Sequence, residues 1–161
     1  MSIAQILETV EAFDGVLILA PDESSGAPEI AWGDYFFYYS PDGSVPHNGQ
    51  PFATIVTKDY PDDTRSDLGP EGRWRVNIHV GREVFHELTG QDTRSFTWSD
   101  YATADAFMPH PIYGALGWVS VVNAGESTMA TVRQLLRDAY QDARGRADRR
   151  AAAGSTGRSG E

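Results

Sequence analysis

The segment from Arg73 to Val80 constrains the fold more than any other part of the sequence. Its apolar residues Trp74, Val76, Ile78 and Val80 alternate strictly with the polar residues Arg73, Arg75, Asn77 and His79. Strict alternation predicts a β-strand with one buried and one polar face, because successive side chains point to opposite sides of a sheet. Such a strand belongs in an antiparallel sheet that is covered by other elements on one side.

Helical patterns at both ends of the chain supply the cover for such a sheet. Ser2 and Gln5 form a capping box at the start of one amphipathic helix, and Ser127 caps a second, longer helix. Further strands are expected at 15–20, 29–32, 35–40, 52–58 and 117–123, and a short helix is expected at 82–88. The sequence therefore predicts an α+β fold, in which the N- and C-terminal helices pack on one face of a single antiparallel sheet of about five to six strands.

Charge and composition divide the chain after residue 143. The 161 residues carry 13 Lys and Arg against 23 Asp and Glu, a net charge of −10, but residues 144–161 have five Arg against Asp148 and Glu161, a net of +3. This last segment has no aromatic or large aliphatic residue, which predicts a disordered tail after a single domain at 1–143. The domain itself has eight cations and 21 acids, a net of −13, and its acidity argues against binding to nucleic acid or anionic membranes.

Several kinds of segment and site are missing from the sequence. The longest apolar run, at 16–20, is far shorter than the roughly 20 residues of a membrane span, and no signal peptide is recognisable, so a cytoplasmic protein is expected. The chain has no Cys, its four His lack the spacing of metal motifs, and it has no phosphate-binding glycine loop. Neither a metal nor another cofactor is expected, and the oligomeric state stays open.

Three polar side chains of the alternating strand form the first candidate site. Arg75, Asn77 and His79 lie at every second position, so they share one side of the strand at intervals of roughly 7 Å. A guanidinium, an amide and an imidazole in a row could bind a carboxylate or phosphate, with the guanidinium as a bidentate anchor. The alternative is that these are the outward residues of a solvated sheet face.

The segment 108–114 is the second candidate, because prolines flank its histidine on both sides. The stiffened backbone lowers the entropic cost of holding the His110 imidazole in one place, and Tyr113 offers a hydroxyl nearby. This arrangement fits a general base or a group that orients a ligand. It also fits a rigid corner in which the imidazole caps a carbonyl group.

The third candidate lies where the expected strand 29–32 ends. Trp32 and Asp34 flank a glycine there, which places a carboxylate beside an aromatic ring and allows close approach of the backbone. The next five residues, 35–39, are all aromatic, so one strand presents rings on both faces. This suits a buried sheet on one side and an aromatic pocket wall on the other, although a strand buried on both faces would also explain it.

Five blocks of sequence carry a resemblance to a known family. They are AWGD (31–34), FATIVTKDYP (52–61), RVN (75–77), PHPIYG (109–114) and WVSVVN (118–123). Over about residues 1–143 the chain resembles an uncharacterised actinobacterial family, domain-of-unknown-function family 6194. The order of elements is more distantly similar to the YjbR/MmcQ-like proteins, which implies a YjbR-like α+β fold with both terminal helices on one face of the sheet, and a DNA-binding role. Neither resemblance supplies an established activity.

Three functional hypotheses follow. The first is a noncatalytic domain that binds a small anionic or polar aromatic molecule on the open polar face of the sheet, beneath the segment 89–114, next to His110. Its expected ligand-binding residues are Trp32, Arg75, Asn77, His79 and Tyr113. The second is an enzyme without cofactor, an isomerase, cyclase or hydrolase, in which His110 moves a proton and Asp34 assists as the second catalytic residue. The third is a nucleic-acid or protein interaction module that uses the Arg-rich tail as an electrostatic arm.

Overall fold

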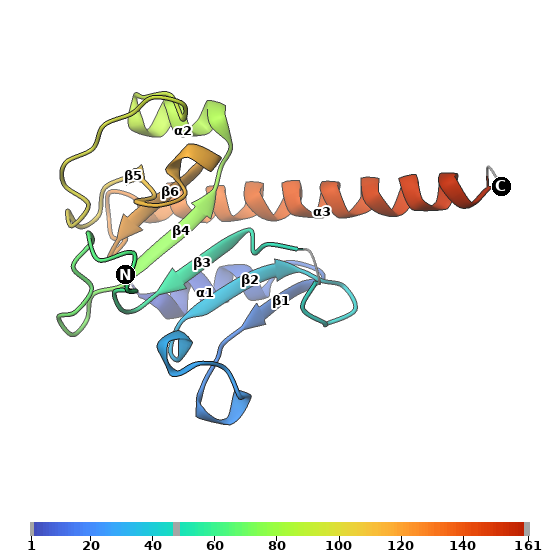
Figure 1. Cartoon of the computed structure of the whole chain (residues 1–161), viewed down its shortest axis with the longest axis horizontal. Coiled ribbons are helices and arrows are strands. Elements are labelled where there is room, and N and C mark those ends of the chain that lie inside the picture. Colours follow the sequence, from blue (N-terminus) through green and yellow to red (C-terminus); the bar gives the residue numbers. More distant parts are fainter. Residues whose placement is uncertain (1, 47–48, 160–161) are drawn as a thin grey trace.

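Six strands form one sheet in the computed structural model, which describes residues 2–46 and 49–159, with side chains as far as residue 153 (Figure 1). The strands are β1 (Val16–Leu19), β2 (Tyr35–Tyr39), β3 (Ala53–Val56), β4 (Arg75–His79), β5 (Met108–Pro109) and β6 (Trp118–Val122). They lie in the order β1-β2-β3-β4-β6-β5, and every neighbouring pair is antiparallel. The predicted α+β fold with one antiparallel sheet is confirmed.

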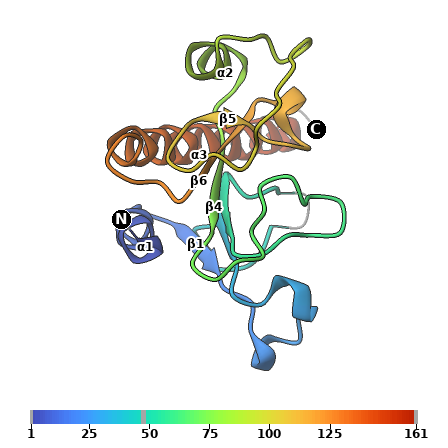
Figure 2. The same ribbon diagram turned by 90° about the vertical axis from the view of Figure 1, so that its left-hand side faces the viewer.

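One face of this sheet is covered by α1 (Ile3–Glu11) and α3 (Met129–Ser159). Figure 2 shows α1 on one side of the strands and the connection from β3 to β4 on the other. The core between helices and sheet takes Ile6 and Val10 from α1, Val76 and Ile78 from β4, and Val132, Leu135, Leu136 and Ala139 from α3. The strict alternation of the β4 sequence therefore predicts the face that packs against the helices, and both terminal helices pack on that face as expected.

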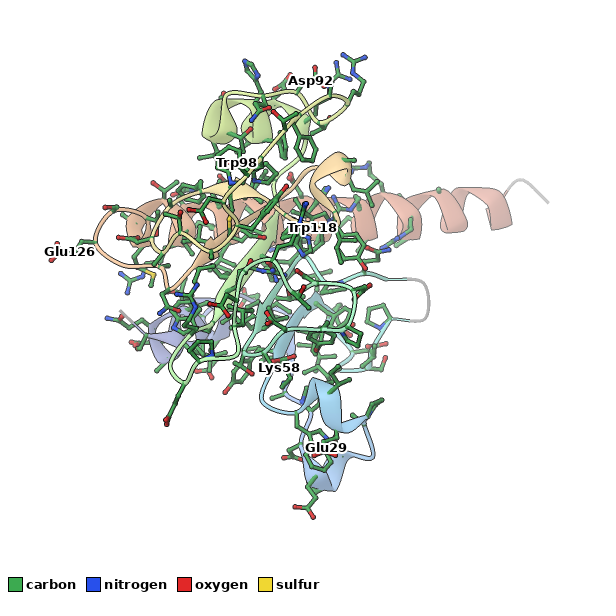
Figure 3. All side chains as sticks on the ribbon, turned by 60° about the vertical axis from the view of Figure 1, so that its left-hand side comes forward. Glu29, Lys58, Asp92, Trp98, Trp118 and Glu126 are labelled. Atoms are coloured by element: carbon green, nitrogen blue, oxygen red, sulfur yellow. The ribbon has the colours of Figure 1, made fainter. Side chains whose placement is uncertain are left out.

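Two short elements differ from the sequence prediction. Residues 29–32 do not form a strand, because Glu29–Ala31 is a 3-10 helix, η2, in the segment between β1 and β2. This segment extends away from the sheet, as the labelled Glu29 shows in Figure 3, and so it finds no partner strand. The sequence does not predict the strand β5, because two residues are too few for a periodic pattern. Its Pro109 is tolerated because β5 lies at the edge of the sheet.

The C-terminal helix continues through residues 144–159, where the composition predicts a disordered tail. In Figure 1 this end of α3 extends well beyond the sheet, and the described side chains from 144 to 153 are mostly exposed. Ala and Arg are strong helix formers, so the helix continues from its packed part with little tertiary support. The observed helix differs from the expected disorder, and the division of the chain at residue 143 stays a prediction. None of the helices in the described part of the chain is long and apolar enough to cross a membrane.

The start of α3 is held by a carboxylate from a distant loop rather than by Ser127. Asp105 accepts hydrogen bonds from the backbone N–H groups of Gly125, Ser127 and Thr128, and from the Thr128 hydroxyl. The hydroxyl bond of Thr128 and the three N–H donors, opposed by partial desolvation, lower the pKa of Asp105 to about 2. The loop between α2 (Arg82–Thr89) and β5 is thereby fixed to the helix that covers the other face.

Candidate functional site

Loops cover the polar face of the sheet. The sequence predicts that this face of β4 is open to solvent, and this prediction is wrong. Arg75 is 1% exposed and Asn77 is 2% exposed. A second apolar cluster lies on this face, made of Val56, Leu68, Tyr101, Met108 and Val122. The loops can bury this face because they also bring a partner for the guanidinium, without which a buried charge is strongly unfavourable.

A cavity of about 480 Å³ remains between these loops and the strands β2, β3 and β4. Aromatic and apolar side chains form its walls, namely Ala31, Phe36, Tyr38, Pro51, Val56, Tyr60, Ile112, Tyr113, Leu116 and Trp118. Its polar lining consists of Gln50, Thr54, Asp62, Asp63, Arg75, Asn77 and His110. Trp118, labelled in Figure 3, begins the strand β6 next to β4. The volume lies within the range of roughly 300–1,000 Å³ that small-molecule sites occupy.

Arg75 is the centre of the polar lining. Its Nη1 and Nη2 donate to Asp63 Oδ1 and Oδ2 at 3.0 Å and 2.5 Å, and Nη1 also donates to Ser66 Oγ at 3.0 Å. Its Nε donates to Asn77 Oδ1 at 2.8 Å. The bidentate ion pair with Asp63 neutralises the guanidinium and fixes its plane. The charge that the sequence analysis assigns to an anionic ligand is therefore already paired within the protein.

Asn77 connects three strands beneath this ion pair. Its Oδ1 also accepts from Ser120 Oγ at 2.7 Å, and its Nδ2 donates to Thr54 Oγ1 at 3.0 Å. Asn77 lies opposite both Thr54 and Ser120 in the strand register, which places the three side chains in one row. The floor of the cavity is thus fixed by hydrogen bonds that the protein makes with itself.

His110 lies beside Arg75, as the first two hypotheses require. Its Nδ1 accepts from the backbone N–H groups of Ile112 and Tyr113, each at 3.0 Å, and its Nε2 lies 3.4 Å from Arg75 Nη2. Two short donors at Nδ1 outweigh one long contact at Nε2, so we assign the ring proton to Nε2. The expected corner flanked by prolines therefore exists, but its imidazole caps two amide N–H groups rather than a carbonyl.

The ionisation of this cluster follows from burial and from the pair of charges. Desolvation and the nearby Arg75 cation lower the pKa of His110 to about 3, although Asp63 acts in the opposite direction. Burial disfavours the ionised form of Asp63, yet its hydrogen bonds to Arg75 and the Arg75 charge hold its pKa below the usual value. At neutral pH the cluster therefore contains an ion pair and an uncharged imidazole.

Asp34 has a structural role that its sequence position does not reveal. Its carboxylate is fully buried and accepts from the Thr57 N–H and hydroxyl, both at 2.8 Å, from Lys58 Nζ at 3.1 Å, and from the Tyr60 hydroxyl. Burial and the bond to Asp34 raise the pKa of Tyr60. Asp34 is not part of the cavity lining, so the structure does not bring it into one site with His110.

The other predicted ligand-binding residues divide between the cavity and its surroundings. Tyr113 lies at the cavity, 49% exposed, with its ring centroid 4.9 Å from that of His110. Trp32 does not line this cavity and donates its indole N–H to Ala27 O at 3.0 Å. His79 lines a neighbouring cavity of about 300 Å³, where its Nε2 lies 3.1 Å from Leu116 O.

The sequence pattern predicts some of the residues that line the cavity but not others. The aromatic run 35–39 predicts rings on both faces, and this is confirmed, because Phe37 is in the core while Phe36 and Tyr38 line the cavity. Asp63 had no such signal. It lies in a loop that also contains Asp59, Asp62 and Asp67, and no pattern separates the carboxylate that pairs with Arg75 from the others.

No group of three or more His, Cys, Asp or Glu is arranged to hold a metal ion within residues 2–46 and 49–159. His47 lies outside these residues.

Fold and site together define an α+β protein with a cavity of small-molecule size on the loop-covered face of its sheet. The chain belongs to a family of unknown function, DUF6194, whose model matches residues 1–152. No curated protein and no solved structure matches the chain. The more distant similarity to YjbR/MmcQ-like proteins and the actinobacterial origin therefore stay predictions.

Proposed function

We propose that this protein binds a small molecule with a flat polar group in the cavity over β2, β3 and β4. The observation that carries the proposal is the contrast between the two parts of the lining. Phe36, Tyr38 and Trp118 supply aromatic walls, whereas Arg75 and His110 supply polar groups at one end. Apolar walls with a few fixed polar groups are typical of small-molecule sites, because the walls supply contact area and the polar groups fix orientation.

The state of His110 supports binding rather than acid–base catalysis. A catalytic imidazole has a pKa near the working pH and a free nitrogen to take up a proton. Here Nδ1 accepts two backbone N–H groups, and the pKa is lowered to about 3. Asp34, the second catalytic residue of the enzyme hypothesis, does not line the cavity, and its carboxylate accepts hydrogen bonds from Thr57, Lys58 and Tyr60. His110 is suited to donate a hydrogen bond from Nε2 and poorly suited to accept a proton.

The test is ligand-induced thermal stabilisation across a panel of small metabolites. We expect at least one compound to raise the unfolding midpoint of the wild type, and this rise to shrink in Tyr113→Ala, which removes an exposed ring at the cavity. Val45→Ala is the control, because Val45 is an apolar residue that is also 49% exposed and does not line the cavity. Equal stabilisation of Tyr113→Ala and wild type, or none by any compound, would contradict the proposal.

A further inference from the structure

Two hydrogen-bond donors face one another at the polar end of the cavity. The assigned tautomer places a proton on His110 Nε2, and this nitrogen lies 3.4 Å from Arg75 Nη2, which also carries protons. Two donors cannot satisfy each other. An acceptor atom at ordinary hydrogen-bond distance from both nitrogens would bond to both, as a carbonyl oxygen with two lone pairs can.

This donor pair, the N–H groups of His110 Nε2 and Arg75 Nη2, is fixed in advance. His110 is 5% exposed, and its ring plane is set by the hydrogen bonds that the backbone N–H groups of Ile112 and Tyr113 donate to Nδ1. The guanidinium is set by Asp63, Ser66 and Asn77. Hydrogen bonds made by preorganised groups at a buried site are stronger than those made in water, and they require little ordering when a ligand arrives.

The charge around the donor pair favours an uncharged acceptor over an anion. Arg75 is the one Lys or Arg among the described lining residues, and Asp63 already binds it in bidentate fashion. Asp62, a second acidic residue, also lines the cavity. A carboxylate or phosphate would lose its hydration and meet no unpaired cation in return.

We infer that the cavity selects a molecule with an uncharged hydrogen-bond acceptor, such as the carbonyl oxygen of an aromatic amide or ketone, held between His110 Nε2 and Arg75 Nη2. This inference rests on the proposed function and adds the chemical class of the ligand. It also replaces the anionic ligand of the sequence-based hypothesis with a neutral one.

Three probes of nearly the same shape distinguish a preference for a neutral acceptor from a preference for an anion or a cation. Benzamide offers a neutral carbonyl oxygen, benzoate offers a charged acceptor, and benzamidine offers donors and a positive charge. Their dissociation constants are measured at pH 7 by titration into the full-length ¹⁵N-labelled protein, with the amide signals of Ile112 and Tyr113 as reporters. We expect benzamide to bind about fivefold more tightly than either other probe. A factor of this size corresponds to the net contribution of about one hydrogen bond to the free energy of binding.

Two substitutions of His110 test whether the donor at Nε2 causes the preference for benzamide. In His110→Asn the side-chain oxygen still accepts from the backbone two and three residues ahead, but the Nε2 donor is lost, so the preference for benzamide should fall to less than about twofold. In His110→Gln the amide nitrogen is placed near the position of Nε2, so the preference should be largely retained if the variant folds. The Asn variant removes both the donor and the ring that packs against Tyr113, but loss of ring contact weakens all three probes alike, so the preference among them reports the donor.

Each outcome supports or overturns a defined statement. Tighter binding of benzamide that is lost in His110→Asn supports the inference. Equal binding of the three probes in the cavity, tighter binding of benzoate or benzamidine, or an unchanged preference in His110→Asn overturns the inference and leaves small-molecule binding in place. Failure of all three probes to perturb any signal of the cavity lining overturns the inference and counts against the proposed function as well.

Discussion

The two faces of β4 are buried to the same extent by opposite means. On one face Val76 and Ile78 pack against the two terminal helices, and on the other Arg75 and Asn77 are equally buried beneath loops. The apolar face is held by non-directional contacts, so the cost of a change there grows with the volume removed. The polar face is held by a few specific bonds, so the loss of one partner leaves a buried charge or donor unsatisfied. Equal burial on the two faces therefore does not mean equal tolerance of substitution.

The largest expected effect is the removal of the carboxylate that pairs with Arg75. Asp63→Asn leaves the guanidinium buried without a counter-charge, and we expect a loss of about 3–5 kcal/mol in the free energy of unfolding, measured with denaturant. Asp62→Asn removes the same charge from the exposed neighbouring residue and should change stability by less than about 0.5 kcal/mol. Similar effects of the two substitutions would show that the ion pair does not hold the polar face together.

The next effect is a dependence on pH that the apolar face does not have. The pKa of His110 is about 3 in the folded protein against 6.5 for an ordinary histidine, so between these values the unfolded chain binds more protons. Stability should therefore fall as the pH falls through this window, by about 2 kcal/mol at pH 5.

The control for this pH effect is His110→Asn, which has no titrating ring. The difference in unfolding free energy between wild type and variant should shrink by about 2 kcal/mol between pH 7.5 and pH 5. This comparison also removes the contribution of His79, whose pKa is lowered by burial and by Arg146 and which is present in both proteins. A difference that stays constant with pH would contradict the neutral, buried state of His110.

A smaller effect is expected for a methyl group removed from the apolar face. Ile78→Val, on the opposite side of β4 from Asn77, should lower the free energy of unfolding by about 0.5–1.5 kcal/mol at every pH between 5 and 8. The affinity for benzamide should not change, because Ile78 does not line the cavity. A marked loss of affinity in a variant that remains folded would show that the two faces are coupled.

The smallest effect should come from the part of α3 that lies beyond both faces. Removal of residues 144–161 should change the free energy of unfolding by about 0.5 kcal/mol or less, because the described side chains there are mostly exposed. The same truncation should leave the affinity for benzamide unchanged. A loss of several kcal/mol in the free energy of unfolding would show that the folded domain extends beyond residue 143.

The sequence predicts the fold better than it predicts the site, for physical reasons. The period of two in β4 and the helical spacing at both ends report which side chains face the core, and these patterns are strong because the core is large and non-directional. The sequence also predicts that Arg75 and His110 share a site, because both segments contain unusual polar groups, and the structure places their side chains 3.4 Å apart. The sequence places Asp34 and Trp32 at the site, because a polar or aromatic residue at a strand end looks the same in sequence whether it faces a cavity or bonds to its own loop. Asp63 has no sequence signal for another reason, since it is one of several aspartates in the same loop.

Both the proposed ligand class and the pH dependence require His110 to be neutral with its proton on Nε2, and the two ring nitrogens report this state. In a long-range ¹H–¹⁵N spectrum of the full-length protein, we expect a protonated Nε2 and an unprotonated Nδ1 for His110 at pH 7, unchanged at pH 5. His86, an exposed histidine of α2, serves as the internal reference in the same sample. A ring that carries its proton on Nδ1, or one that is charged at pH 5, would show that His110 is not a neutral Nε2 donor.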